Sequence, residues 1–239
     1  MDLKCRRVWF QVLNELPRFL PFLLSVCIYF VLAPQSSCPL WIKALLKCLP
    51  NLFLCTYIWA PGINMYTQAK ARKLLAGLLF SAAGDIFRTL STQLYHLHSV
   101  SMFGLAYVCY IWMFGLKPVN LLAGLYLAII GAVYLLFLTR CLWDQNSFQW
   151  AAFIYIGAGG TMAWRACAGI LFIQSWSWLK LSAAIGGLLL VVSDFTYTVS
   201  AWCFPVSNST MIAATYYTGQ MLIALSAVNP QKLVGRNKR

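Results

Sequence analysis

Long apolar runs separated by short polar connections dominate this sequence and leave few folds open to it. Only 10% of the residues are charged and 61% are hydrophobic, whereas a soluble domain has about 25% charged residues. A single core cannot bury this much apolar sequence, so we interpret the chain as an integral membrane protein. A bilayer-crossing helix needs about 20 mostly apolar residues, and lipid leaves no partner for open backbone groups, so runs of this length are predicted to be helices.

Eight runs reach this length, which predicts an all-α membrane protein: an eight-transmembrane-helix bundle forming one domain over residues 1–239. Several runs are followed by proline, which is common just beyond helix ends. The predicted spans are 17–34, 40–60, 71–91, 98–116, 119–139, 149–173, 179–203 and 209–227.

The lysines and arginines orient the predicted bundle. Thirteen of them fall on one side of an eight-span arrangement, and the opposite connections hold Arg140 and little else. Cytoplasmic loops are enriched in Lys and Arg, so both termini are predicted to be cytoplasmic. The thirteen cations are Lys4, Arg6, Arg7, Arg18, Lys70, Arg72, Lys73, Lys117, Lys180, Lys232, Arg236, Lys238 and Arg239.

The net charge of +13 does not indicate a nucleic-acid binder. Such proteins gather their cations on one patch, whereas here the cations flank apolar runs and the two ends of the chain. We therefore expect membrane lipids, and no nucleic acid, as partners. The sequence leaves a monomer and a homo-oligomer equally open.

Cysteine and histidine give only weak signals. The nine cysteines show no CxxC spacing. Cys38, Cys141 and Cys203 fall near one predicted face, and a disulfide among them is left open. His96 and His98 have no third ligand nearby in the sequence, so we expect no metal site.

Two of the five acidic residues, Asp85 and Asp194, lie inside apolar runs. Asp85 is fifteen residues past Lys70, and Asp194 is fourteen past Lys180. At about 1.5 Å per residue these separations are roughly 22 and 21 Å, so both carboxylates share one depth on parallel helices. A carboxylate at membrane depth is costly and is usually functional. The coincidence favours one shared site, and it would also fit a four-plus-four repeat of the spans.

Two cations lie near this depth. Lys47 is on the second predicted span, and Arg88 is one turn from Asp85, at i and i+3. The spacing allows an ion pair between Arg88 and Asp85 on one helix face. In that alternative, the pair is structural and neutralises itself.

Several motifs, in order along nearly all the spans, make the chain recognisable. It resembles the lysoplasmalogenase family, the YhhN-like group of multi-span membrane proteins, and is similar to its animal-type members. The motifs are Lys47-Cys48-Leu49-Pro50, Phe80-Ser81-Ala82-Ala83-Gly84-Asp85, Trp164-Arg165-Ala166, Val192-Ser193-Asp194, Cys203-Phe204-Pro205-Val206 and the run from Thr215 to Val228.

The resemblance implies an eight-helix bundle that hydrolyses the vinyl ether bond of lysoplasmalogens without a cofactor. The substrate would be a lysophospholipid, 1-alkenyl-glycerophosphocholine or -ethanolamine, and the products a fatty aldehyde and the glycerophospho compound. The two membrane aspartates of the family match Asp85 and Asp194. Multi-span insertion and a lysolipid substrate suggest the endoplasmic reticulum.

Three positions depart from the family pattern. Tyr107 stands where members commonly have His, Ser200 where they tend to have Asn, and Arg88 where an apolar residue is usual. All three are predicted to lie near the site. They favour one alternative hypothesis, a lysolipid-binding paralogue without turnover.

Vinyl ether hydrolysis sets the roles of the predicted site residues. Protonation at carbon gives an oxocarbenium ion that water traps, so the site needs a protonated acid and a nearby negative charge. Burial raises the pKa of a carboxyl group, and a carboxyl pair can divide the two roles. Asp85 and Asp194 are the predicted pair. Arg88 beside Asp85 would favour the ionised form there, which favours Asp194 as the acid.

The remaining candidates are substrate-binding residues. Lys47 or Arg88 would bind the lipid phosphate. The other candidates, which would orient water or the headgroup, are Tyr107, Tyr216, Tyr217 and Gln220. Helix-packing hydrogen bonds are the alternative role for the three residues of the last span. A further alternative for the whole protein is a proton-coupled transporter that uses the two aspartates as a relay.

Overall fold

The described part of the chain contains eight α-helices and no strand, which confirms the all-α prediction. The computed structural model describes residues 3–33, 38–59, 69–90, 93–117, 119–141, 146–170, 178–205 and 209–227. The helices are α1 (Leu3–Leu32), α2 (Leu40–Trp59), α3 (Ala69–Leu90), α4 (Gln93–Phe114), α5 (Leu121–Cys141), α6 (Asn146–Cys167), α7 (Trp178–Trp202) and α8 (Ser209–Ala227).

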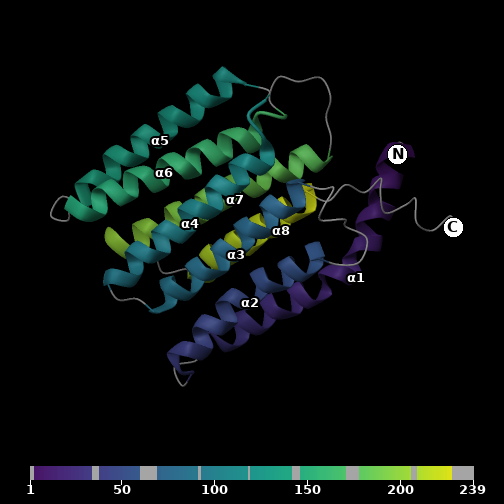
Figure 1. The fold of residues 1–239 in the computed structure, drawn as a ribbon, viewed down its shortest axis with the longest axis horizontal. Helices are drawn as coiled ribbons and strands as arrows, with labels where there is room; N and C mark the ends of the chain where they lie inside the picture. The colour runs from purple at the N-terminus through teal and green to yellow at the C-terminus, as the bar shows by residue number, and fades with distance from the viewer. Residues whose placement is uncertain are drawn as a thin grey trace.

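Each helix covers one predicted span, and the largest differences are in α1 and α6. Helix α1 begins at Leu3 and contains Pro17 and Pro21, so the first predicted span is only its second, apolar part. Prolines inside a helix commonly cause a bend, and α1 turns away from the bundle toward its N-terminal end (Figure 1). Helix α6 ends at Cys167, before the predicted end at residue 173.

Four helices in the described residues are long and apolar enough to cross a membrane: α2, the part of α4 from His96, α5 and α7. The apolar part of α1, Pro17–Leu32, is shorter. Of the cations used to orient the spans, the tail residues Lys232, Arg236, Lys238 and Arg239 lie outside the described residues.

Polar and apolar side chains are distributed as a membrane protein requires. Large apolar side chains such as Leu121, Ile130 and Leu136 of α5 are exposed, while the buried polar and charged side chains include Asn51, Ser81, Asp85, Asp194 and Gln220. An outer apolar surface of this extent would be an aggregation hazard in water. Lipid contact on the outside and polar contacts within the bundle account for both features.

The central helices of the bundle are α3, α4, α7 and α8, with α1 and α2 on one side and α5 and α6 on the other (Figure 1). Helix α3 packs against α4 and α2, α7 packs against α8 and α6, and α4 packs against α6. Helix α5 packs chiefly against α6. Buried side chains from α2, α3, α4, α6, α7 and α8 can therefore meet in the interior.

Glycine brings the two C-terminal helices close together. A Cβ atom at Gly186 of α7 would lie 2.9 Å from the backbone oxygen of Gly219 on α8, and the reverse distance is also 2.9 Å. Small residues permit such close approach between membrane helices. The contact fixes α8 against α7, and on α8 it lies one turn from Tyr216.

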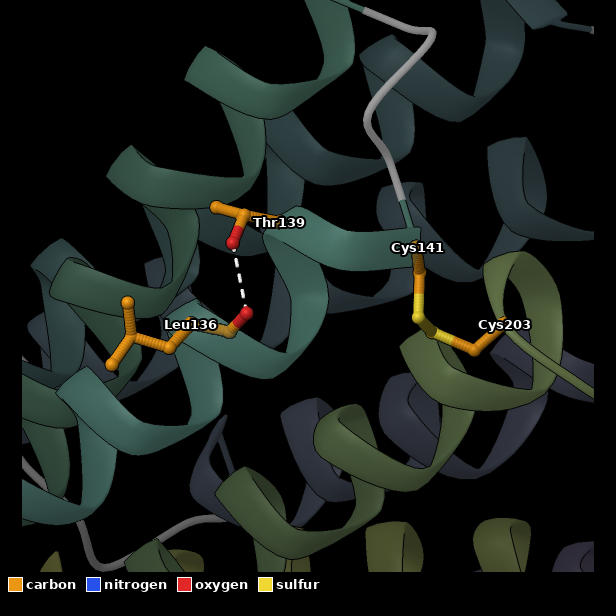
Figure 2. Close-up of a disulfide and its surroundings, with 4 residues drawn as sticks. All are labelled: Leu136, Thr139, Cys141 and Cys203. Atoms are coloured by element: carbon orange, nitrogen blue, oxygen red, sulfur yellow. Dashed lines mark hydrogen bonds between the residues drawn. A yellow bond between two sulfur atoms is a disulfide. The ribbon is translucent and has the colours of Figure 1, made fainter.

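A disulfide joins the C-terminal end of α5 to the residue that follows α7. It links Cys141 and Cys203, whose Cα atoms are 5.2 Å apart (Figure 2). The sequence left three cysteines open for such a bond, and the third, Cys38, is free. In the turn before Cys141, the hydroxyl of Thr139 donates to the backbone oxygen of Leu136 at 2.8 Å (Figure 2).

Candidate active site

Asp85 on α3 is fully buried and contacts two uncharged donors from neighbouring helices. The side-chain amide of Asn51 on α2 donates to Asp85 Oδ2 at 2.8 Å, and the hydroxyl of Tyr216 on α8 donates to the same oxygen at 2.9 Å. The Asn51 amide also donates to the Tyr216 hydroxyl at 2.8 Å. The second carboxyl oxygen, Oδ1, is buried without a hydrogen-bond partner among the described residues.

Asp194 on α7 has a different set of partners. Its Oδ1 forms an ion pair with the Arg88 guanidinium at 3.1 Å. Its Oδ2 accepts hydrogen bonds from the hydroxyls of Tyr107 on α4 and Tyr155 on α6. The rings of these two tyrosines are stacked, with centroids 5.4 Å apart. Asp194 therefore has a cation and two hydroxyl donors.

The ion pair of Arg88 differs from the one that its spacing allowed. In the described residues, Arg88 pairs with Asp194 and not with Asp85. The i and i+3 spacing brings Asp85 and Arg88 to one region of α3, but the guanidinium reaches across to α7. It is held between two aromatic rings, 4.1 Å from the centroid of Phe103 and 3.9 Å from that of Tyr197. Arg88 thus links the surroundings of the two aspartates.

The structure brings Tyr107 and Tyr216 directly to the aspartates, whereas Tyr217 and Lys47 lie beside them. The hydroxyl of Tyr217 donates to the backbone oxygen of Lys47 at 2.8 Å. The Lys47 ammonium lies 6.0 Å from the centroid of the Tyr197 ring. Tyr217 therefore fixes α8 against α2, and Lys47 points toward the ring that covers Arg88.

Gln220 lies apart from both aspartates, in a second buried network. It accepts a hydrogen bond from the Tyr110 hydroxyl at 2.8 Å and donates one to the Ser81 hydroxyl at 3.1 Å. Ser81 is one turn before Asp85 on α3, and Gln220 is one turn after Tyr216 on α8. The network therefore joins α3, α4 and α8 one layer away from Asp85.

The two histidines pack as aromatic side chains. His96 contacts the ring of Trp202, with centroids 5.6 Å apart, and His98 contacts that of Phe87 at 5.5 Å. No group of three residues able to hold a metal ion occurs in the part of the chain that the structure describes.

Two contacts of the aspartates were missed by the sequence reasoning: Asn51 on Asp85 and Tyr155 on Asp194. The sequence did indicate Asn51 as a candidate, since it is an amide in an apolar run, directly after the Lys47–Pro50 motif. Tyr155 carried little signal, because tyrosine is common in membrane helices and its partner lies 39 residues away.

The position of Tyr107 explains one departure from the predicted family pattern. A tyrosine hydroxyl at this position donates to Asp194, and an imidazole N–H is also a hydrogen-bond donor. Tyr107 therefore provides a donor on α4 facing the carboxylate of α7, as the predicted family histidine would.

The family model described as the YhhN family matches residues 42–227. The chain belongs to the YhhN family. It is 39% identical to lysoplasmalogenase TMEM86A of Bos taurus and 37% identical to that of Homo sapiens, in each case over 93% of both chains. It is 34% identical to lysoplasmalogenase TMEM86B of Homo sapiens over 87% of this chain and 85% of the relative. No solved structure matches the chain.

Membership of the YhhN family confirms the resemblance seen in the motifs, and these relatives carry the name of an enzyme. The predicted assignment to a lysoplasmalogenase family of enzymes is therefore confirmed. The matched region contains every residue described above in contact with Asp85 or Asp194.

Proposed function

We propose that this protein hydrolyses the vinyl ether bond of lysoplasmalogens, 1-alkenyl-glycerophosphocholine or -ethanolamine, at Asp85 and Asp194. The observation that carries the proposal is the pair of buried carboxylates with contrasting partners, linked by Arg88. Relatives named lysoplasmalogenase over most of the chain support this substrate class.

Asp85 is the general acid in this proposal, which reverses the preference drawn from sequence. An ionised carboxylate with a buried, unpartnered oxygen is costly, and Asp85 Oδ1 is such an oxygen. A protonated Oδ1 has its O–H free for a substrate carbon. Asp194 is the ionised member, because a guanidinium and two hydroxyls stabilise its negative charge.

The reaction balances with these two residues and one water. Asp85 transfers its proton to the alkenyl carbon adjacent to the ether carbon, which gives an oxocarbenium ion and an Asp85 carboxylate. The negative charges of the site stabilise that cation. Water attacks the ether carbon and returns a proton to Asp85. The hemiacetal then collapses to the fatty aldehyde and the glycerol hydroxyl.

The other predicted binders take supporting roles. Arg88 and Lys47 are the cations available for the lipid phosphate, and Tyr216 positions Asp85 through its hydrogen bond. Tyr107 holds the Asp194 carboxylate, and Tyr217 holds α8 on α2. Gln220 supports the layer next to Asp85.

In the proposed membrane arrangement all eight helices cross the bilayer as one domain, with both termini cytoplasmic and the bundle in the endoplasmic reticulum. Lys70, Lys117 and Lys180 then lie at the cytoplasmic end. The disulfide between Cys141 and Cys203 lies at the other end. Disulfides persist in oxidising compartments such as the reticulum lumen, which supports this orientation.

Aldehyde release by the purified protein tests the function. A 1-alkenyl lysophospholipid is expected to yield aldehyde, and a 1-acyl lysophospholipid of equal chain length serves as the control. Asp85→Asn and Asp194→Asn are each expected to lower the rate at least 100-fold, since general acid catalysis contributes about 10²–10⁴-fold. The rates are compared per folded protein.

Different results would favour the alternatives. Lysolipid binding without aldehyde release from wild-type protein would favour the lysolipid-binding paralogue. Proton-dependent solute flux in proteoliposomes, again without aldehyde, would favour the transporter. Retained turnover in either aspartate variant would contradict the two-carboxylate mechanism.

A further inference from the structure

A cavity lies among α3, α4, α6 and α7 and reaches the partners of Asp194. Its wall includes Arg88, Tyr155, Tyr197 and Trp202. Arg88 and Tyr155 both contact Asp194, so this part of the wall borders the candidate active site. Trp202 is the last residue of α7, directly before the disulfide cysteine. The cavity therefore extends from the active site toward the disulfide end of the bundle.

One wall of the cavity carries a positive charge, the Arg88 guanidinium. The Arg88 side chain is 7% exposed, and its Nε is buried without a hydrogen-bond partner among the described residues. One of its terminal nitrogens already pairs with Asp194. Guanidinium groups bind phosphate through charge-assisted hydrogen bonds, so this cation on the cavity wall suits a phosphodiester.

The rest of the wall combines aromatic, aliphatic and hydroxyl side chains. His96, Tyr155, Tyr197 and Trp202 line it, and none of its described lining residues carries a carboxylate. A trimethylammonium group binds aromatic faces, whereas a primary ammonium has three N–H donors to satisfy.

We propose that this cavity is the headgroup subsite of the hydrolase and that it prefers a choline phosphodiester over an ethanolamine one. Arg88 binds the phosphate, and Trp202 contacts the trimethylammonium group. The inference rests on the proposed function and adds a headgroup preference to it. A headgroup in this position leaves the glycerol and its vinyl ether beside Arg88, next to Asp194.

Binding of saturated ether lipids tests the subsite without requiring turnover. The probes are radiolabelled 1-alkyl-glycerophosphocholine and 1-alkyl-glycerophosphoethanolamine of one chain length, with the full-length protein in detergent micelles. Equilibrium binding gives a Kd for each. The wild-type protein is expected to bind the choline lipid about tenfold more tightly, the size of a desolvated cation–π contact.

Variants at Trp202 identify the residue responsible. Trp202→Leu is expected to bring the ratio of the two Kd values close to one, and Trp202→Phe to keep most of the preference. Trp150→Leu is the matched control, because Trp150 is 72% exposed on α6 and is not part of the cavity wall. Ala152→Leu narrows the cavity and is expected to weaken choline lipid binding more than ethanolamine lipid binding.

Two results would overturn the proposal: equal wild-type affinities, or an unchanged ratio in folded Trp202→Leu protein. If Trp202→Leu does not fold, the ratio measured for Ala152→Leu decides. Aldehyde release is scored separately. A choline preference without any aldehyde would refute the proposed function but support the headgroup subsite. Aldehyde release without a choline preference would support the proposed function but refute the headgroup subsite.

Discussion

The groups in direct contact with Asp85 and with Asp194 differ in charge, although both residues are buried aspartates on central helices. Asp85 accepts hydrogen bonds from an amide and a hydroxyl, and one of its oxygens is unpartnered. Asp194 is paired with a guanidinium and two hydroxyls. The first environment tolerates a neutral carboxyl group, and the second requires an ionised one.

The difference shows how one residue type can fill two roles. Glycosidases also divide an acid and an anion between two carboxyl groups by their environments. Here the division depends on Arg88, which is one turn from Asp85 but pairs with Asp194. The following predictions test this contrast, starting with the largest expected effect.

Replacing each aspartate by asparagine should have unequal effects on stability. Asp194→Asn leaves the Arg88 guanidinium buried and unpaired, so we expect the free energy of unfolding to fall by about 3–5 kcal/mol. Asp85→Asn keeps a side-chain oxygen that can accept from Asn51 and Tyr216 and should cost no more than about 1 kcal/mol. Unfolding in mixed micelles measures both. Equal losses would show that the two environments do not differ as described.

The two tyrosines on Asp194 should act together. Tyr107→Phe or Tyr155→Phe alone leaves one donor on Oδ2, so each should cost no more than about 1.5 kcal/mol. The double variant should cost more than the sum, which a double-mutant cycle measures. Tyr107→His supplies another donor and should keep most aldehyde release. Strict additivity in the cycle would argue against a shared acceptor.

Donors to Asp85 should affect the rate more than stability. Tyr216→Phe and Asn51→Leu each remove one hydrogen bond to Oδ2, and we expect each to lower kcat about tenfold, or about 1.4 kcal/mol of barrier. Steady-state kinetics on a 1-alkenyl lysolipid give kcat and KM. A change confined to KM would indicate that these residues bind the lipid and do not position the acid.

Gln220 should give the smallest effect on turnover. Its partners are Ser81 and Tyr110, one layer from Asp85. Gln220→Met should lower stability by about 1–2 kcal/mol and change the rate of aldehyde release less than about threefold, a difference of roughly 0.6 kcal/mol. A large loss of rate in a stable variant would place Gln220 in the catalytic machinery.

Helix positions were largely predictable because apolar length alone indicates a spanning segment. The run 209–227 was predicted with the bounds that α8 has. The N-terminal part of α1 was missed, since the first predicted span began at residue 17 with the apolar run, whereas the helix begins at Leu3.

The partners of the aspartates were harder to predict. The shared depth of Asp85 and Asp194 followed from helical rise, but rise does not give the rotation of one helix against another. The i and i+3 rule compares residues on one helix only, so it paired Arg88 with Asp85 and could not find Asp194 on α7. Asn51 and Tyr155 were missed for the same reason.

The disulfide between Cys141 and Cys203 sets an order of events during synthesis. The two cysteines are 62 residues apart, and α6 and α7 lie between them. The bond can form only after both of these helices have been made and the end of α7 has reached the compartment of Cys141. Helix α7, which carries Asp194, is therefore complete before the disulfide attaches the peripheral helix α5 to the bundle.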